Sequence, residues 1–260
     1  MLLGIFGDSF SADKETIIGD VTLTTYTDIV AKQLGLTAVN FSYPGTSIWY
    51  SYKQFVKNYK KFSHIIFCYT DADRWHYLPE YLHRFSSIYT KEKLDTFPTI
   101  GNKEYEEMTD LVKIHKLIHD AEFNNFVFQT IFDKVNFICK RNGIKLINIM
   151  PFVNEKNFDL DFSKNRGICY INLLSISDSE LYHKLGGYRH KEFRFFTGGP
   201  DLRKNHLTQE NNKALADIIL ENIDSETYKV IDLYKDKRFS YDVNQLLKYK
   251  RLVEMHRDEM

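Results

Sequence analysis

The chain has 260 residues, of which 43% are hydrophobic and 27% are charged, as is ordinary for a globular protein with a sizeable core. Its 35 basic residues balance its 35 acidic ones, so it lacks the basic excess of a nucleic-acid-binding protein. No apolar run has the length of a membrane span, and the N-terminus lacks the basic region of a signal peptide. We therefore expect a cytoplasmic protein without a nucleic-acid or membrane partner.

Short apolar runs alternate with helical patterns along most of the chain. The runs predict five strands, at residues 2–6, 36–41, 64–69, 144–150 and 168–174. Apolar residues at a helical spacing predict helices at residues 22–35, 48–60, 124–142, 178–185 and 208–223. This alternation predicts right-handed crossovers, and therefore an α/β fold with a parallel sheet covered by helices on both faces.

We expect one α/β domain over residues 1–225, a three-layer sandwich around a five-stranded parallel sheet. Residues 76–122 break the rhythm and have weak periodicity, so they are interpreted as an aromatic insertion, helical near 105–119. Residues 226–260 are interpreted as a C-terminal extension, poor in strands, with an amphipathic helix near 243–256.

The cysteines and histidines do not indicate a metal site. Cys68, Cys139 and Cys169 are odd in number and lie in apolar runs, which predicts buried free thiols. His115 and His119 have a helical spacing that can bind zinc, but no third ligand is nearby in the sequence. We therefore expect no metal and no other cofactor.

Residues 7–11, Gly-Asp-Ser-Phe-Ser, follow the first predicted strand directly. A strand end holds a side chain rigidly at a crevice, so Ser9 is a candidate nucleophile, provided that a base can reach it. The alternative is that Asp8, Ser9 or Ser11 caps a helix. Asp8 is interpreted as fixing the turn through backbone N–H groups, and it is also a candidate for substrate contact.

Other candidate residues follow the strands whose carboxyl ends meet at the same edge of a parallel sheet. Gly45 lies in the turn after the second strand, where a backbone N–H can face a ligand without a side chain in the way. His206 precedes the last regular helix and is a candidate base for Ser9. Candidates for substrate contact follow the third strand: Asp71, Arg74 and Trp75.

Three short blocks, taken together, resemble the SGNH (GDSL-type) hydrolases. Residues 7–11 resemble the first block of that family, and residues 40–45, Asn-Phe-Ser-Tyr-Pro-Gly, resemble the second. His206, followed by Leu-Thr and a predicted helix, resembles the last block. The resemblance implies a flavodoxin-like fold and a serine hydrolase without a cofactor. Ser9 would be its nucleophile, His206 its base, and the N–H groups of Ser9 and Gly45 its oxyanion donors.

Two positions depart from the family pattern. The third family block is Gly-x-Asn-Asp, and Thr70 stands where its oxyanion-binding asparagine would be. The Thr70 hydroxyl can donate to the oxyanion, although its side chain is shorter than that of asparagine, and Arg74 can supply positive charge instead. The alternative is that Thr70 caps the turn after the third strand. The family acid, three residues before the histidine, is replaced by Arg203. Either Asp201, five residues before His206, or a backbone carbonyl would then orient the imidazole.

These observations lead to two hypotheses. The first is a carboxylic ester hydrolase that removes acyl groups such as acetate from a carbohydrate or similar polar ester. The second is a catalytically weakened SGNH fold that serves as a binding or structural module. The second hypothesis follows from the two departures and from a resemblance to divergent, virus-encoded members of the family, which would imply a virion-associated protein.

Overall fold

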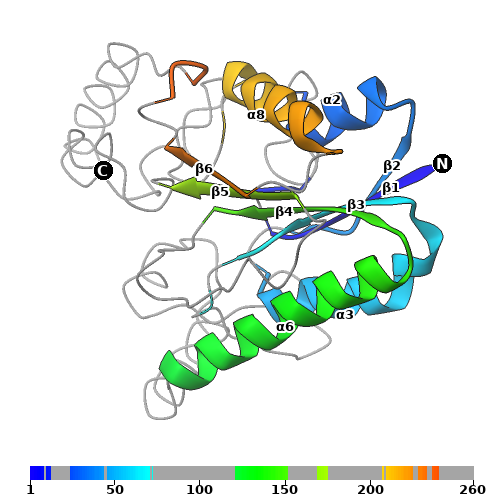
Figure 1. The fold of residues 1–260 in the computed structure, drawn as a ribbon, viewed down its shortest axis with the longest axis vertical. Coiled ribbons are helices and arrows are strands. Elements are labelled where there is room, and N and C mark those ends of the chain that lie inside the picture. The colour runs from blue at the N-terminus through cyan, green and yellow to red at the C-terminus, as the bar shows by residue number, and fades with distance from the viewer. Residues whose placement is uncertain are drawn as a thin grey trace, which may run out of the picture.

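A computed structural model describes residues 1–8, 10–12, 24–43, 46–70, 72, 121–151, 169–174, 207, 209–224, 228–232 and 236–239. Within these ranges, helices cover both faces of one parallel sheet (Figure 1). The expected α/β class and parallel sheet are therefore confirmed. No helix among the described residues is long and apolar enough to cross a membrane.

Six strands form the described sheet, one more than expected. Their bounds are β1 Leu2–Phe6, β2 Thr37–Asn40, β3 His64–Cys68, β4 Lys145–Met150, β5 Cys169–Leu174 and β6 Tyr228–Asp232. The strand order is β2-β1-β3-β4-β5-β6, and every neighbouring pair is parallel. The first five strands have the order of flavodoxin-like doubly wound sheets, and their carboxyl ends all lie at one edge.

The unexpected strand β6 corrects the interpretation of the tail. Residues after 225 were expected to be helical and poor in strands, but Tyr228–Asp232 pairs with β5 and continues the sheet. Ile231 in this strand is buried in the core. The prediction of five strands is therefore wrong, because it omits this edge strand. β6 forms through pairing with β5 more than through its local sequence.

Four α-helices are described: α2 Tyr26–Gln33, α3 Ile48–Asn58, α6 Ala121–Arg141 and α8 Gln209–Asn222. α2 and α8 pack together on one face of the sheet, and α3 and α6 pack together on the other (Figure 1). A short 3₁₀ helix, Tyr59–Lys61, follows α3 directly. α6 includes the last two residues that were assigned to the insertion.

Local sequence explains where these helices begin and end. Thr25 and Asp28 form a capping box at the start of α2, and Ser47 caps α3 by accepting a hydrogen bond from the Tyr50 N–H. Gly35 and Gly143 follow α2 and α6 with positive φ angles of 62° and 64°. Glycine adopts this left-handed conformation without a steric penalty, and the two helices end two residues and one residue before their expected ends at 35 and 142.

The core consists of two clusters of buried side chains, one on each face of the sheet. Successive strand residues alternate between them: Leu3 and Ile5 pack toward α2 and α8, whereas Phe6 packs toward α3 and α6. β3 does the same with Ile66 and Phe67. Because both faces are buried, these strands are continuous apolar runs rather than alternating ones.

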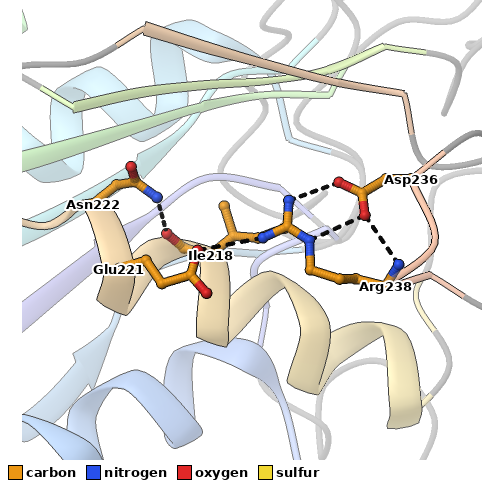
Figure 2. Close-up of polar contacts among 5 residues, drawn as sticks. All are labelled: Ile218, Glu221, Asn222, Asp236 and Arg238. Carbon is orange, nitrogen blue, oxygen red and sulfur yellow. Dashed lines mark hydrogen bonds and ion pairs between the residues drawn. The ribbon is translucent and has the colours of Figure 1, made fainter.

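Residues 236–239 pack onto α8. Phe239 is buried in the cluster on the α8 side of the sheet. Arg238 binds both carboxylate oxygens of Asp236, at 3.0 and 2.7 Å, and reaches Glu221 of α8 at 3.4 Å (Figure 2). Asn222 donates a hydrogen bond to the Ile218 carbonyl beside this cluster. This part of the tail therefore belongs to the folded domain.

The buried-thiol prediction is confirmed for two cysteines. Cys68 and Cys139 are free and buried, and burial raises the pKa of the Cys139 thiol to about 12. The Cys169 side chain lies outside the described residues. The remainder of the expected insertion and the expected helices at 178–185 and 243–256 also lie outside them.

Candidate functional site

The candidate site lies at the carboxyl edge of the sheet. The chain leaves β1, β2 and β3 at this edge, and α2 and α8 begin there because each runs back to the start of a parallel strand. Two of the predicted site residues, Asp8 and Thr70, are described. The others lie outside the described residues: Ser9, Gly45, Asp71, Arg74, Trp75, Asp201 and His206.

Asp8 fixes the turn that follows β1. Its Oδ1 accepts a hydrogen bond from the Phe10 N–H at 3.0 Å, and its backbone carbonyl accepts from the N–H groups of Ser11 and Ala12 at 3.1 and 2.9 Å. This is the turn-fixing role that the sequence predicts. Because Asp8 is fully buried, its side chain presents no surface to a substrate in this arrangement, contrary to the expected substrate contact.

The glycine before Asp8 is required by its surroundings. A Cβ atom at Gly7 would lie 2.2 Å from the Ser11 Oγ and 2.8 Å from the Cys68 Cβ. Both distances are far below van der Waals contact, so any side chain would push the turn away from β3. Gly7 therefore allows the residues around Ser9 to pack directly against the neighbouring strand.

Thr70 connects the end of β3 to the turn after β1. Its hydroxyl is buried and donates a hydrogen bond to the Asp8 Oδ2 at 2.9 Å. A hydroxyl has a single proton to donate, so in this arrangement Thr70 has none for an oxyanion. The hydroxyl is thus bound to the turn after β1 and not to the turn after its own strand, which the alternative prediction named, and an oxyanion role requires this hydrogen bond to break.

The turn after β2 is bound to the turn after β1 on both sides of Gly45. The Tyr43 N–H donates to the Gly7 carbonyl at 3.3 Å. The Thr46 hydroxyl donates to the Tyr43 carbonyl at 2.8 Å and also lies 3.2 Å from the Gly7 carbonyl. The Ser11 hydroxyl donates to the Ser42 hydroxyl at 2.9 Å. The residues that flank Gly45 therefore lie against the residues that flank Ser9.

Asn40, the last residue of β2, reinforces this connection. Its Nδ2 donates to the Ser11 carbonyl at 2.8 Å, and its Oδ1 accepts from the Ser42 N–H at 2.8 Å. Sequence reasoning used Asn40 and Ser42 only as parts of a family block and assigned no role to Thr46. The available signal was that polar side chains gather at the end of the second predicted strand.

The residue after His206 is fixed near the start of α2. Leu207 is buried in the same cluster as Phe10. The Asn212 Nδ2 donates to the Leu207 carbonyl at 3.1 Å, and the Asn212 Oδ1 accepts from the Tyr26 N–H at 2.9 Å. Sequence reasoning missed Asn212, whose position on the buried side of α8 gave no sign of this role.

Tyr26 fills the space beneath the turn after β1. Its ring lies 6.0 Å from the Phe10 ring. Burial, with smaller electrostatic contributions from Cys68 and Asp8, raises the pKa of Tyr26 well above its usual value. The buried phenol therefore stays protonated to a higher pH than an exposed tyrosine does.

The described residues hold no group of three or more His, Cys, Asp or Glu side chains that could bind a metal ion.

Comparison with known proteins finds no family model and no curated protein sequence that matches the chain. Among solved structures, an acetyl xylan esterase is similar with a TM-score of 0.43 and 14% identity, over 85% of this chain and 98% of that chain. A likeness this weak carries no inference about activity.

Proposed function

We propose that the chain is a serine ester hydrolase of the SGNH (GDSL) type, with Ser9 as nucleophile and His206 as base. The observation that carries this proposal is the junction at the carboxyl edge of the sheet. Neighbours of Ser9 contact neighbours of Gly45, and Leu207, next to His206, shares a buried cluster with Phe10. The three blocks that resemble the family thus have neighbours that converge on one edge. The flavodoxin-like order of β1 to β5 supports the same family.

The proposed reaction is acyl transfer through Ser9. His206 takes the Ser9 proton as the hydroxyl oxygen attacks the ester carbonyl, and the N–H groups of Ser9 and Gly45 bind the resulting oxyanion. His206 then protonates the leaving alcohol, and water releases the acyl group from Ser9. Asp201 or a backbone carbonyl orients the imidazole. These steps need no metal or organic cofactor.

The proposed substrate is a carbohydrate or similar polar molecule that carries a small acyl group such as acetate. Asp71, Arg74 and Trp75 follow β3 in the sequence. They are therefore proposed to contact the alcohol part of the substrate. Charged and aromatic side chains suit a sugar, which offers hydroxyl groups at its edges and C–H groups on its faces.

The contact between Thr70 and Asp8 favours a slow enzyme. Loss of one oxyanion donor costs about 10²–10³ in rate in serine hydrolases. With the Thr70 proton donated to Asp8, the proposed oxyanion hole has two backbone donors. Esters with good leaving groups, which depend less on oxyanion stabilisation, are therefore the better test substrates.

The same contact supports the second candidate function, a weakened SGNH fold that acts as a binding or structural module. A site that has the fold but lacks the third oxyanion donor and the usual triad acid keeps its shape, while its rate of ester hydrolysis falls. This function fits a virus-encoded, virion-associated protein. The two candidates differ in whether Ser9 turns over an ester at all.

Hydrolysis of p-nitrophenyl acetate and labelling by a fluorophosphonate test the proposal. Wild type is expected to hydrolyse the ester and to be labelled, whereas Ser9→Ala and His206→Ala lose both activities. Ser63→Ala is the matched control, because Ser63 directly precedes β3 at the opposite edge, where its hydroxyl contacts the Leu2 carbonyl. If wild type and Ser9→Ala have equal rates and neither is labelled, the enzyme proposal is wrong and the binding module remains.

A further inference from the structure

We infer that Thr70 is a positioning residue, whose hydrogen bond to Asp8 holds the Ser9 turn against the end of β3. This inference rests on the proposed function, since Ser9 is the group to be positioned. It assigns to Thr70 a role in the reaction other than binding the oxyanion. It also makes Asp8 the link between the turn and the sheet.

The geometry of the Asp8 carboxylate carries the inference. Its Oδ1 accepts from the Phe10 N–H at 3.0 Å, and its Oδ2 accepts from the Thr70 hydroxyl at 2.9 Å. Asp8 and Phe10 are the two neighbours of Ser9 in the chain. The carboxylate therefore bridges the residues on both sides of Ser9 and ties that bridge to a different strand.

Thr70 suits this anchoring role. It is separated from the last residue of β3, Cys68, by Tyr69 alone, and the Tyr69 N–H bonds to the β4 residue Ile149 at 2.9 Å. The backbone before Thr70 thus continues the sheet, and the branched side chain has few accessible rotamers. A hydrogen bond to a buried carboxylate is also stronger than one between neutral groups. The hydroxyl is a fixed point to which the turn is attached.

The Thr70 hydroxyl has one proton, so it can donate either to Asp8 or to the oxyanion, but not to both at once. A Thr70 hydroxyl that donates to Asp8 acts on Ser9 only through Asp8. A hydroxyl that donates to the oxyanion acts whether or not Asp8 is present. The dependence of the Thr70 effect on Asp8 therefore distinguishes the two roles, and a double-mutant cycle measures it.

The experiment measures kcat and KM for p-nitrophenyl acetate, and the rate of fluorophosphonate labelling, in the full chain. Thr70→Val keeps the shape of the side chain and removes the hydroxyl. It is expected to lower kcat about tenfold to a hundredfold, as a small misplacement of a reacting group does, with KM little changed. Thr70→Ser retains the hydroxyl and is expected to restore most of the rate. In an Asp8→Ala background, Thr70→Val is expected to have no further effect.

Thr27→Val is the matched control. It also removes a buried threonine hydroxyl, one that shares a 2.8 Å hydrogen bond with the hydroxyl of Thr25, the residue that caps α2. This substitution is expected to lower the midpoint of thermal unfolding and to leave kcat unchanged. Thr70→Ala, which leaves room for a water molecule beside Asp8, replaces Thr70→Val if the valine variant does not fold.

Three outcomes would overturn the inference. Unchanged kcat in a folded Thr70→Val or Thr70→Ala variant would show that the hydrogen bond does not position Ser9. An equal loss of rate with and without the Asp8 side chain would assign Thr70 to the oxyanion instead. Absence of Ser9-dependent labelling in wild type would overturn both the inference and the proposed function, whereas the first two outcomes leave the proposed function intact.

Discussion

Substitution of Gly7 by alanine tests how closely the turn after β1 packs against β3. The added Cβ would lie 2.2 Å from the Ser11 Oγ, 2.8 Å from the Cys68 Cβ and 2.9 Å from the Cys68 carbonyl oxygen. The Ser11 side chain can rotate, but the Cys68 carbonyl belongs to a central strand and cannot move without disturbing the sheet. The turn itself must therefore shift.

The expected loss of stability follows from two opposing effects. Overpacking a buried site costs about 1–3 kcal/mol, whereas replacing glycine by alanine stabilises by about 0.4–1 kcal/mol through the unfolded chain. The net effect of Gly7→Ala is a decrease of about 1–2 kcal/mol in the free energy of unfolding. The same shift moves Ser11 and the residues beside Ser9, so ester hydrolysis is expected to fall by more than the loss of folded protein explains.

Gly4→Ala is the matched control for this prediction. A Cβ at Gly4 would lie 2.7 Å from the Phe62 ring, within the core and away from the carboxyl edge. It is expected to lower stability by a similar amount and to leave the activity of the folded protein unchanged. Urea unfolding followed by tryptophan fluorescence, with p-nitrophenyl acetate turnover, measures both effects. Gly7→Ala with wild-type stability and turnover would refute the packing described for this turn.

Four further predictions concern other parts of the molecule. Gly143→Ala is expected to lower the unfolding free energy by about 1 kcal/mol because of its positive φ, and Gly143→Asn by less; equal urea midpoints for both variants would contradict this reasoning. Burial keeps the Cys139 thiol protonated, so peptide mapping after iodoacetamide treatment near pH 8 is expected to find it modified only in denaturant. Burial and then Lys145 lower the pKa of His64, while Asp224 raises it, so Asp224→Asn is expected to lower this pKa further in an NMR titration; an upward shift would contradict the assignment. Since the unfolded chain binds this proton more readily, His64 also makes stability fall as the pH drops below its usual pKa. Thr70→Asn is expected to raise kcat for p-nitrophenyl acetate, and an unchanged or lower kcat in a folded variant would count against the proposed oxyanion hole.

The part of the fold that could be predicted from the sequence is the part that local patterns determine. Apolar runs located β1 to β5, and the glycines at 35 and 143 marked the ends of α2 and α6 because each has a positive φ. β6 could not be predicted in this way. The run Tyr228–Asp232 is short, and it becomes a strand because it pairs with β5, more than fifty positions earlier in the sequence.

The candidate site shows the same division. The sequence placed Asp8 and Thr70 at strand ends that meet at one edge, and both are there. It did not predict that the Thr70 hydroxyl donates to Asp8, because these two groups meet only when the turn after β1 packs against the end of β3. Asn212 was missed for a similar reason, since its two partners, Leu207 and Tyr26, lie in different segments.

The difference between a hydroxyl and an amide at position 70 explains why both candidate functions remain consistent with one fold. An asparagine amide has two N–H protons, so one can bind the Asp8 carboxylate while the other faces an oxyanion. A threonine hydroxyl has one proton, and in this structure it binds Asp8. Thr70 therefore makes the contact that holds the turn and has no second proton for an oxyanion. A site built in this way keeps its geometry with a smaller catalytic contribution, whether it hydrolyses a reactive ester slowly or binds a ligand without turnover.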